Sequence, residues 1–107
     1  MARLIEIAEV RGAPPHLVVR VGDVLQFNAG GGVVREGADV LEKLGPFHPA
    51  VIVGDGTALS PEGMPSTVMF VARARGSAVI EVISGDLWQS PVRTVLNVTV
   101  EPPPDGR

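Results

Sequence analysis

Residues 92–101 read VRTVLNVTVE, and apolar side chains recur there at every second position. One parity holds the side chains that we expect in a core: Thr94, Leu96, Val98 and Val100. The other parity holds side chains that we expect in water: Arg93, Asn97 and Thr99. A period of two places successive side chains on opposite faces of a β-strand. The stretch therefore predicts a half-buried strand.

Similar patterns precede it along the chain. Residues 78–84 place Ala78, Ile80 and Val82 on one side and Glu81 on the other, while residues 67–72 (TVMFVA) read as a central strand. Residues 24–28 and 4–10 also read as strands, with Leu25 and Phe27 inward in the first and Ile5 and Ile7 opposite Glu6 in the second. Weaker strand patterns cover residues 17–21, 40–44 and 51–53. Residues 35–44 (REGADVLEKL) also fit helical spacing, so we expect one short helical turn there.

Turn signals separate these runs at intervals typical of a sandwich or a barrel, among them Gly12 to Pro15, Gly22-Asp23, Gly76-Ser77 and Gly85-Asp86. The chain has 107 residues and no Cys. We therefore predict an all-β, immunoglobulin-like antiparallel β-sandwich of seven or eight strands without a disulfide. It occupies residues 1–101 as a single domain, and residues 102–107 form a Pro-rich tail.

The charge pattern argues against several classes of partner. The net charge is −3, and the arginines are scattered rather than gathered in a stripe that could neutralise phosphates. No apolar run approaches the ~20 residues of a membrane span. Glu6 and Glu9 interrupt the N-terminal stretch where a signal peptide would be apolar. We expect no nucleic-acid partner, no membrane span, and either a cytoplasmic protein or the mature form of a secreted or periplasmic one.

Residues suited to catalysis or metal binding are few. His16 and His48 are the only imidazoles, and each adjoins a proline, which predicts loops. Carboxylates that could join them in a metal site are Asp39, Asp55 and Glu62, but no paired-histidine spacing supports one. Ser60, His48 and Asp55 could form a triad only on paper, because no nucleophile elbow is present. We predict no enzyme, no metal site and no cofactor.

Two further stretches bear on binding. Residues 28–32 (NAGGG) lack the Lys-Ser/Thr of a phosphate-binding loop and read as a flexible turn. Residues 84–91 (SGDLWQSP) hold the only tryptophan, Trp88, between two strand patterns. Trp88 is either a lid folded over the sandwich edge or an anchor for a partner, since Trp is enriched at interface hot spots.

Three segments together carry a family resemblance. LVVRVGDVLQFN (17–28) joins two strand patterns through Val-Gly-Asp, MFVARARGSAVIEVISGDLW (69–88) ends at Trp88, and VRTVLNVTV (92–100) closes the domain. This order resembles bacterial immunoglobulin-like domains and is most similar to the chagasin-type inhibitors of papain-like cysteine proteases. In that family, three loops at one end of the sandwich enter the protease cleft.

The resemblance implies a partner-binding surface on the matching loops. Asn28 matches the first loop, where Ala29, Gly30, Gly31 and Gly32 stand in place of the family's Pro-Thr-Thr-Gly. Gly54 and Gly56 resemble the Gly-rich second loop, and Trp88 matches the third, with Asp86-Leu87 where Arg-Pro would stand. The implied partner-binding residues are Asn28, Gly30, Gly31, Gly54, Gly56 and Trp88.

The sequence thus predicts a non-enzymatic immunoglobulin-like module that binds a protein, in its sharpest form an inhibitor of papain-like cysteine proteases. Two alternatives stay open. One is a structural or adhesive module of a larger assembly. The other is a small metal-binding or hydrolytic protein centred on His48 and Asp55.

Overall fold

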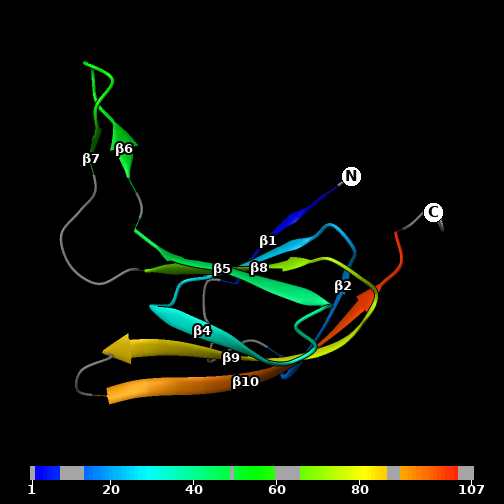
Figure 1. The fold of residues 1–107 in the computed structure, drawn as a ribbon. Coiled ribbons are helices and arrows are strands. Elements are labelled where there is room, and N and C mark those ends of the chain that lie inside the picture. The colour runs from blue at the N-terminus through cyan, green and yellow to red at the C-terminus, as the bar shows by residue number, and fades with distance from the viewer. Residues whose placement is uncertain (1, 8–13, 49, 60–65, 87–89, 104–107) are drawn as a thin grey trace.

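The computed structural model describes residues 2–7, 14–48, 50–59, 66–86 and 90–103. Two four-stranded sheets lie face to face, and a two-stranded sheet stands apart from them (Figure 1). The ten strands of the described residues are β1 (Leu4–Ile7), β2 (His16–Arg20), β3 (Val24–Phe27), β4 (Gly31–Glu36), β5 (Leu41–Phe47), β6 (Val51–Ile52), β7 (Ala58–Leu59), β8 (Thr67–Ala72), β9 (Gly76–Asp86) and β10 (Ser90–Glu101).

The first sheet has the order β1-β3-β8-β5, and the second has the order β2-β10-β9-β4. β9 and β10 form a long antiparallel hairpin in which Leu96 lies opposite Ile80. Two pairs are parallel: β1 with β3, and β2 with β10. The two N-terminal strands therefore lie at the edges of different sheets.

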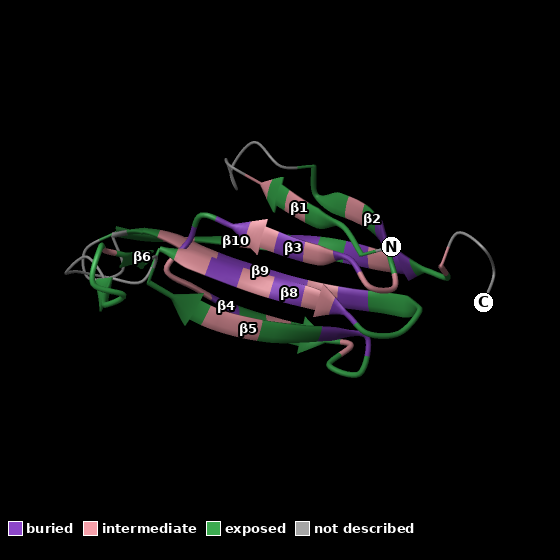
Figure 2. Ribbon diagram, turned by 90° about the horizontal axis from the view of Figure 1, so that it is seen from above, coloured by how far each residue is buried: buried purple, intermediate pink, exposed green. Residues whose placement is uncertain are grey.

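The core lies between the two sheets, and buried residues alternate with less buried ones along β3 and β8 (Figure 2). Phe27 of β3 and Phe70 of β8 pack edge to face, with ring centroids 5.8 Å apart. Leu96, Ile80 and Val82 of the opposite sheet belong to the same core and are fully buried. Burial of these apolar side chains is the main term that stabilises the sandwich.

The all-β, immunoglobulin-like sandwich predicted from the sequence is confirmed, and so is the face assignment in β10. Leu96, Val98 and Val100 are buried, while Arg93 and Asn97 are exposed. Thr94 and Thr99 are each half-buried. The period-two pattern thus places the correct side of the strand in the core.

The strand number and the strand directions differ from the prediction. Ten strands replace the predicted seven or eight, because β4 and β7 were not among the strands expected from the sequence. The two parallel pairs depart from an antiparallel sandwich. Side-chain periodicity reports which face is buried but carries no information on the direction of the neighbouring strand.

The predicted helical turn at residues 35–44 is limited to one hydrogen-bonded turn between β4 and β5. The Gly37 carbonyl accepts from the amides of Val40 (2.8 Å) and Leu41 (3.0 Å). Gly37 has a φ of +83°, and a Cβ there would lie 2.6 Å from the Ser77 carbonyl oxygen. A helix cannot pass through a residue in this conformation, so the flanking residues extend as strands.

Candidate binding surface at one end of the sandwich

Three connections meet at one end of the sandwich. β3 ends at Phe27, which pairs with Val68 near the start of β8, and β5 ends at Phe47, which pairs with Thr67. In the other sheet, β4 begins at Gly31 opposite Ile83, close to the end of β9. The β3–β4, β5–β8 and β9–β10 connections therefore share this end, and Figure 1 shows β6 and β7 rising from it.

The first connection is tighter than the flexible turn expected from its glycines. Asn28 is exposed, but Ala29 is buried and its amide donates to the Phe27 carbonyl at 3.0 Å. Gly31 already belongs to β4. A Cβ on Gly32 would lie 3.0 Å from the ring of Phe70, so this glycine makes room for a core aromatic. Only residues 28–30 form the bend.

The second connection carries the two-stranded sheet, which we call the arm (residues 51–59). Val51 pairs with Leu59 and Ile52 pairs with Ala58. At the tip, the Val53 amide donates to the Thr57 carbonyl (2.9 Å) and the Gly56 amide donates to the Val53 carbonyl (2.9 Å). Gly56 adopts a φ of +87°, as the turn requires, whereas a Cβ placed on Gly54 would meet no atom within 4 Å.

Asp55 lies at the tip of the arm. Its Oδ1 accepts a hydrogen bond from the Thr57 amide at 2.9 Å, which is the bonding of an Asx turn. Hydrogen bonding to Thr57 favours the carboxylate and lowers the pKa of Asp55. The tip therefore presents a negative charge in a turn of defined shape.

The arm exposes apolar side chains that the sandwich core does not cover. Val51 is 65%, Ile52 is 70% and Leu59 is 52% exposed. Figure 2 shows the strand β6 as exposed throughout. Sequence reasoning predicted a weak strand at residues 51–53 and missed the arm. The available signal was the apolar run VIV directly before the turn residues Gly54, Asp55 and Gly56.

The third connection contains Trp88, which lies outside the described residues. It follows β9, which ends at Asp86, and precedes β10, which begins at Ser90. Whether Trp88 acts as a lid or as an anchor stays a prediction.

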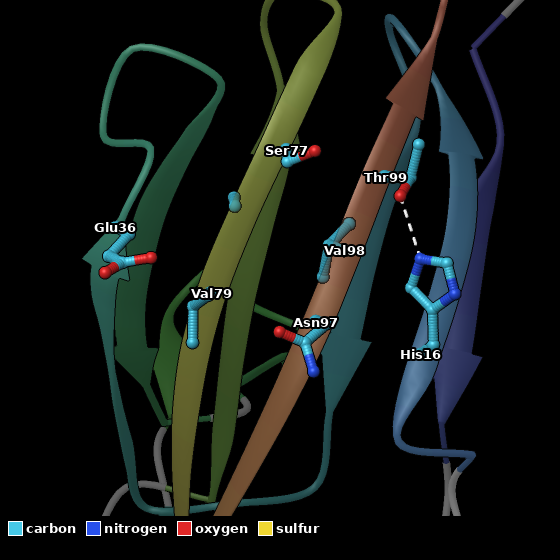
Figure 3. Close-up of a pocket in the computed structure, with 8 residues that line it drawn as sticks. His16, Glu36, Ser77, Val79, Asn97, Val98 and Thr99 are labelled. Carbon is cyan, nitrogen blue, oxygen red and sulfur yellow. Dashed lines mark hydrogen bonds between the residues drawn. The ribbon is translucent and has the colours of Figure 1, made fainter.

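A shallow pocket of about 340 Å³ lies on the outer face of the second sheet (Figure 3). Its polar lining comes from four strands and consists of His16, Glu36, Ser77, Asn97 and Thr99. His16 was expected in a loop, but it is the first residue of β2, and its Nε2 lies 2.8 Å from Thr99 Oγ1. Pairing with β10 through Asn97 draws this residue into the sheet.

The residues of the alternative catalytic or metal site are not brought together in the described ranges. No three His, Asp or Glu side chains there are placed to hold a metal ion. His48 is exposed just after β5, Asp55 is engaged with Thr57, and Ser60 lies outside the described residues. Within the same ranges, no helix is long and apolar enough to cross a membrane.

Asp23 is a buried carboxylate whose ion pair with the half-exposed Arg3 was missed by sequence reasoning. Arg3 donates to it through Nε (3.0 Å) and Nη2 (2.6 Å), and the Arg20 amide donates to Oδ2 (2.8 Å). The hydrogen bonds from Arg3 outweigh burial and lower the pKa of Asp23. The pair ties β1 to the β2–β3 turn. Its partners are 20 residues apart in the sequence, so no local pattern indicates it.

Glu81 faces outward as predicted, yet it is buried. Nη1 of Arg35 and Nη1 of Arg93 each donate to one of its carboxylate oxygens at 3.0 Å. The three side chains come from β4, β9 and β10. Such pairing satisfies a carboxylate that would otherwise be costly to bury.

No protein-family model and no curated protein matches the chain. Among solved structures, the solution structure of Amebosin is 14% identical, with 94% of this chain and 99% of that chain covered and a TM-score of 0.51. A crystal structure of the cysteine protease inhibitor EhICP2 from Entamoeba histolytica is 11% identical, with 94% and 97% covered and a TM-score of 0.46. A mutant of amicyanin with Cu(I) is 16% identical, with 94% and 82% covered and a TM-score of 0.40. The likeness to Amebosin extends over nearly the whole of both chains and shows that the two proteins share a fold.

Proposed function

We propose that this chain is a non-enzymatic protein-binding module that binds its partner through the end of the sandwich where the three connections meet. The observation that carries the proposal is the arm, whose apolar side chains lie in solvent. Exposed apolar groups gathered on one element are typical of a surface that a partner covers. Asn28 and Gly30 of the β3–β4 connection, and Gly31 at the start of β4, lie at the same end and would border that surface.

The partner that we propose is a papain-like cysteine protease, which the chain would inhibit by occupying the active-site cleft. The motif resemblance in residues 17–28 and 69–88 supports this choice. In such a complex, Trp88 is the largest apolar side chain available in the third connection, Gly56 lets the arm turn tightly, and Gly54 lies beside it at the tip.

Inhibition of papain by the purified chain tests the proposal. We expect hydrolysis of a peptide substrate to fall in a concentration-dependent and reversible manner, with no cleavage of the chain itself. Unchanged hydrolysis at a large molar excess of the chain would rule out the protease as its partner.

Trp88→Ala separates the two roles of the tryptophan. If Trp88 is an anchor, the variant should lose inhibition while its free energy of unfolding stays within ~0.5 kcal/mol of the wild type. If Trp88 is a lid, denaturation should show a loss of about 3 kcal/mol or more. A blue-shifted tryptophan emission in the free wild type, together with that loss, would exclude the anchor.

A further inference from the structure

The pocket on the outer face of the second sheet is built from two neighbouring rows of side chains that cross the strands. Strand pairing places the members of the first row side by side, from β2 to β4: His16, Asn97, Val79 and Glu36. In the second row, Thr99 of β10 pairs with Ser77 of β9. Figure 3 shows Asn97 in the middle of the first row. The hydrogen-bond ladders of the sheet therefore fix the spacing of the lining groups.

The two rows give the pocket an elongated shape. Neighbouring strands lie about 4.8 Å apart, so the first row spans roughly 14 Å across the four strands, and the second row adds about 7 Å along them. The pocket has a volume of about 340 Å³ and is shallow. A small ligand, or one segment of a longer one, can lie across the strands and reach both rows.

The lining offers hydrogen bonds of both kinds. The carboxylate of Glu36 accepts, whereas the hydroxyl of Ser77 and the amide of Asn97 both donate and accept. These three side chains are exposed. Figure 3 shows one hydrogen bond among the lining residues, between Nε2 of His16 and Oγ1 of Thr99 (2.8 Å). The polar groups of Glu36, Ser77 and Asn97 are therefore not engaged with one another.

This lining disfavours several classes of ligand. Among the described residues, no Arg or Lys lines the pocket, and Glu36 would repel a phosphate or another anion. The described His, Asp and Glu side chains form no group that could hold a metal ion. An apolar molecule would meet polar groups where sites for such ligands are mostly apolar. A ligand covered with hydroxyl groups fits, because each hydroxyl donates and accepts as the lining does.

The geometry points to a binding site for a neutral saccharide, whose hydroxyl groups bond to Glu36, Asn97 and Ser77. The pocket uses the last residue of β4 and the beginning of β9, whereas β4 begins and β9 ends at the three connections. The saccharide would therefore bind away from the surface proposed for the protein partner. The inference does not depend on the identity of that partner.

Titration of the isotope-labelled chain with maltose, cellobiose and lactose, followed by NMR, tests the site. We expect saturable shifts of the backbone amides of residues 77–79 and 97–99, with residues 51–59 unaffected. Asn97→Ala should weaken binding about tenfold, because a ligand hydroxyl loses its hydrogen-bond partner. Val95→Ala is the matched control: Val95 is the next outward-facing residue of β10 and lies outside the pocket. Melting temperatures confirm that the variants are folded.

Glu36 distinguishes a saccharide from a cationic amine. Glu36→Ala should weaken saccharide binding about tenfold, whereas Glu36→Gln should keep most of the affinity, because its amide still bonds to hydroxyl groups. Glu6→Gln, on β1 of the other sheet, is the control and should bind as the wild type does. Putrescine is the amine probe. Saturable binding of putrescine that Glu36→Gln abolishes, without any response to the saccharides, would overturn the inference in favour of an amine site.

The remaining outcomes address the source of the saccharide and the independence of the two sites. Slower migration of the wild type, but not of Asn97→Ala, through a gel that contains soluble starch or hydroxyethylcellulose would assign the site to a longer glycan. Unchanged migration together with disaccharide binding would assign it to free saccharides. No shift at a large molar excess of every saccharide, or shifts confined to residues outside the pocket, would overturn the site. Asn97→Ala should inhibit papain as the wild type does, so failure of one proposal leaves the other standing.

Discussion

Asp23 shows how one residue can hold three segments together. It accepts from Arg3 ahead of β1 and from the Arg20 amide at the end of β2, and its own carbonyl accepts from the Ala72 amide at 2.9 Å. Removing one partner of such a pair leaves the other charge without compensation, which costs more than the pair itself contributes.

Stability should depend on pH through Asp23. The pKa of Asp23 is lower in the folded chain than in the unfolded chain, so as the pH falls the carboxylate is protonated at a higher pH in the unfolded chain. The stability from the Arg3–Asp23 pair is complete above the unfolded pKa of about 4. It is then lost as the pH drops from there through the folded pKa. Urea denaturation between pH 2 and pH 7 measures this loss.

Asp23→Asn should be less stable at pH 7 and should lack this part of the pH dependence. Asp39→Asn, in the exposed turn before β5, is the control and should follow the wild-type curve. An unchanged acid profile in Asp23→Asn would assign the pH dependence to other groups.

A substitution at Leu96 tests the packing of the core. Leu96 is buried against the opposite sheet, so Leu96→Ala should destabilise the fold by roughly 2–5 kcal/mol, as core truncations do. Its neighbour Asn97 is exposed, and Asn97→Ala should change the free energy of unfolding by no more than about 0.5 kcal/mol. Equal effects of the two substitutions would contradict the register of β10.

Among the elements, the turn between β4 and β5 directs the chain from one sheet to the other. It depends on Gly37, which is packed against the backbone of Ser77 and Ala78 with a positive φ. The sequence showed helical spacing around it because Val40 and Leu41 both point inward, and both are buried. Tertiary contact with β9, which no local pattern reports, decides the conformation.

Gly37→Ala should therefore destabilise the fold by more than about 1 kcal/mol, because the methyl group meets backbone atoms that cannot move aside. Gly54→Ala is the matched control, since a Cβ there meets nothing within 4 Å. Its effect should stay within about 0.5 kcal/mol, or be slightly stabilising. Chemical denaturation of the two variants compares them directly.

For the whole molecule, the sequence is informative where a pattern is local. The alternation in β10 predicts its buried face, and the apolar run of residues 67–72 predicts a central strand, as β8 is. Gly22 marks a turn as expected, whereas Gly76 and Gly85, also expected in turns, belong to β9 with positive φ values. Features that depend on long-range contacts are not predicted from the sequence. Contacts between residues far apart in the sequence decide the parallel pairing of β1 with β3 and of β2 with β10. They also decide the Arg3–Asp23 pair and the projection of the arm.

Metal binding can be tested on the intact chain. We expect equimolar zinc or copper to leave the melting temperature unchanged, because a tight site would raise it by mass action. His16→Ala combined with His48→Ala provides the check. A metal-induced rise that disappears in this double variant would overturn the expectation.

The place of β10 between β2 and β9 has a consequence for biosynthesis. While the nascent chain is still emerging from the ribosome, β2 and β9 lack their partner strand β10, and His16 cannot yet pair with Asn97. The backbone hydrogen-bonding groups along these two strand edges stay exposed. Strand edges and uncovered apolar faces such as that of Ile80 invite aggregation. The second sheet closes only when β10 has left the ribosome, and a chain cut short before β10 is a substrate for chaperones and proteases.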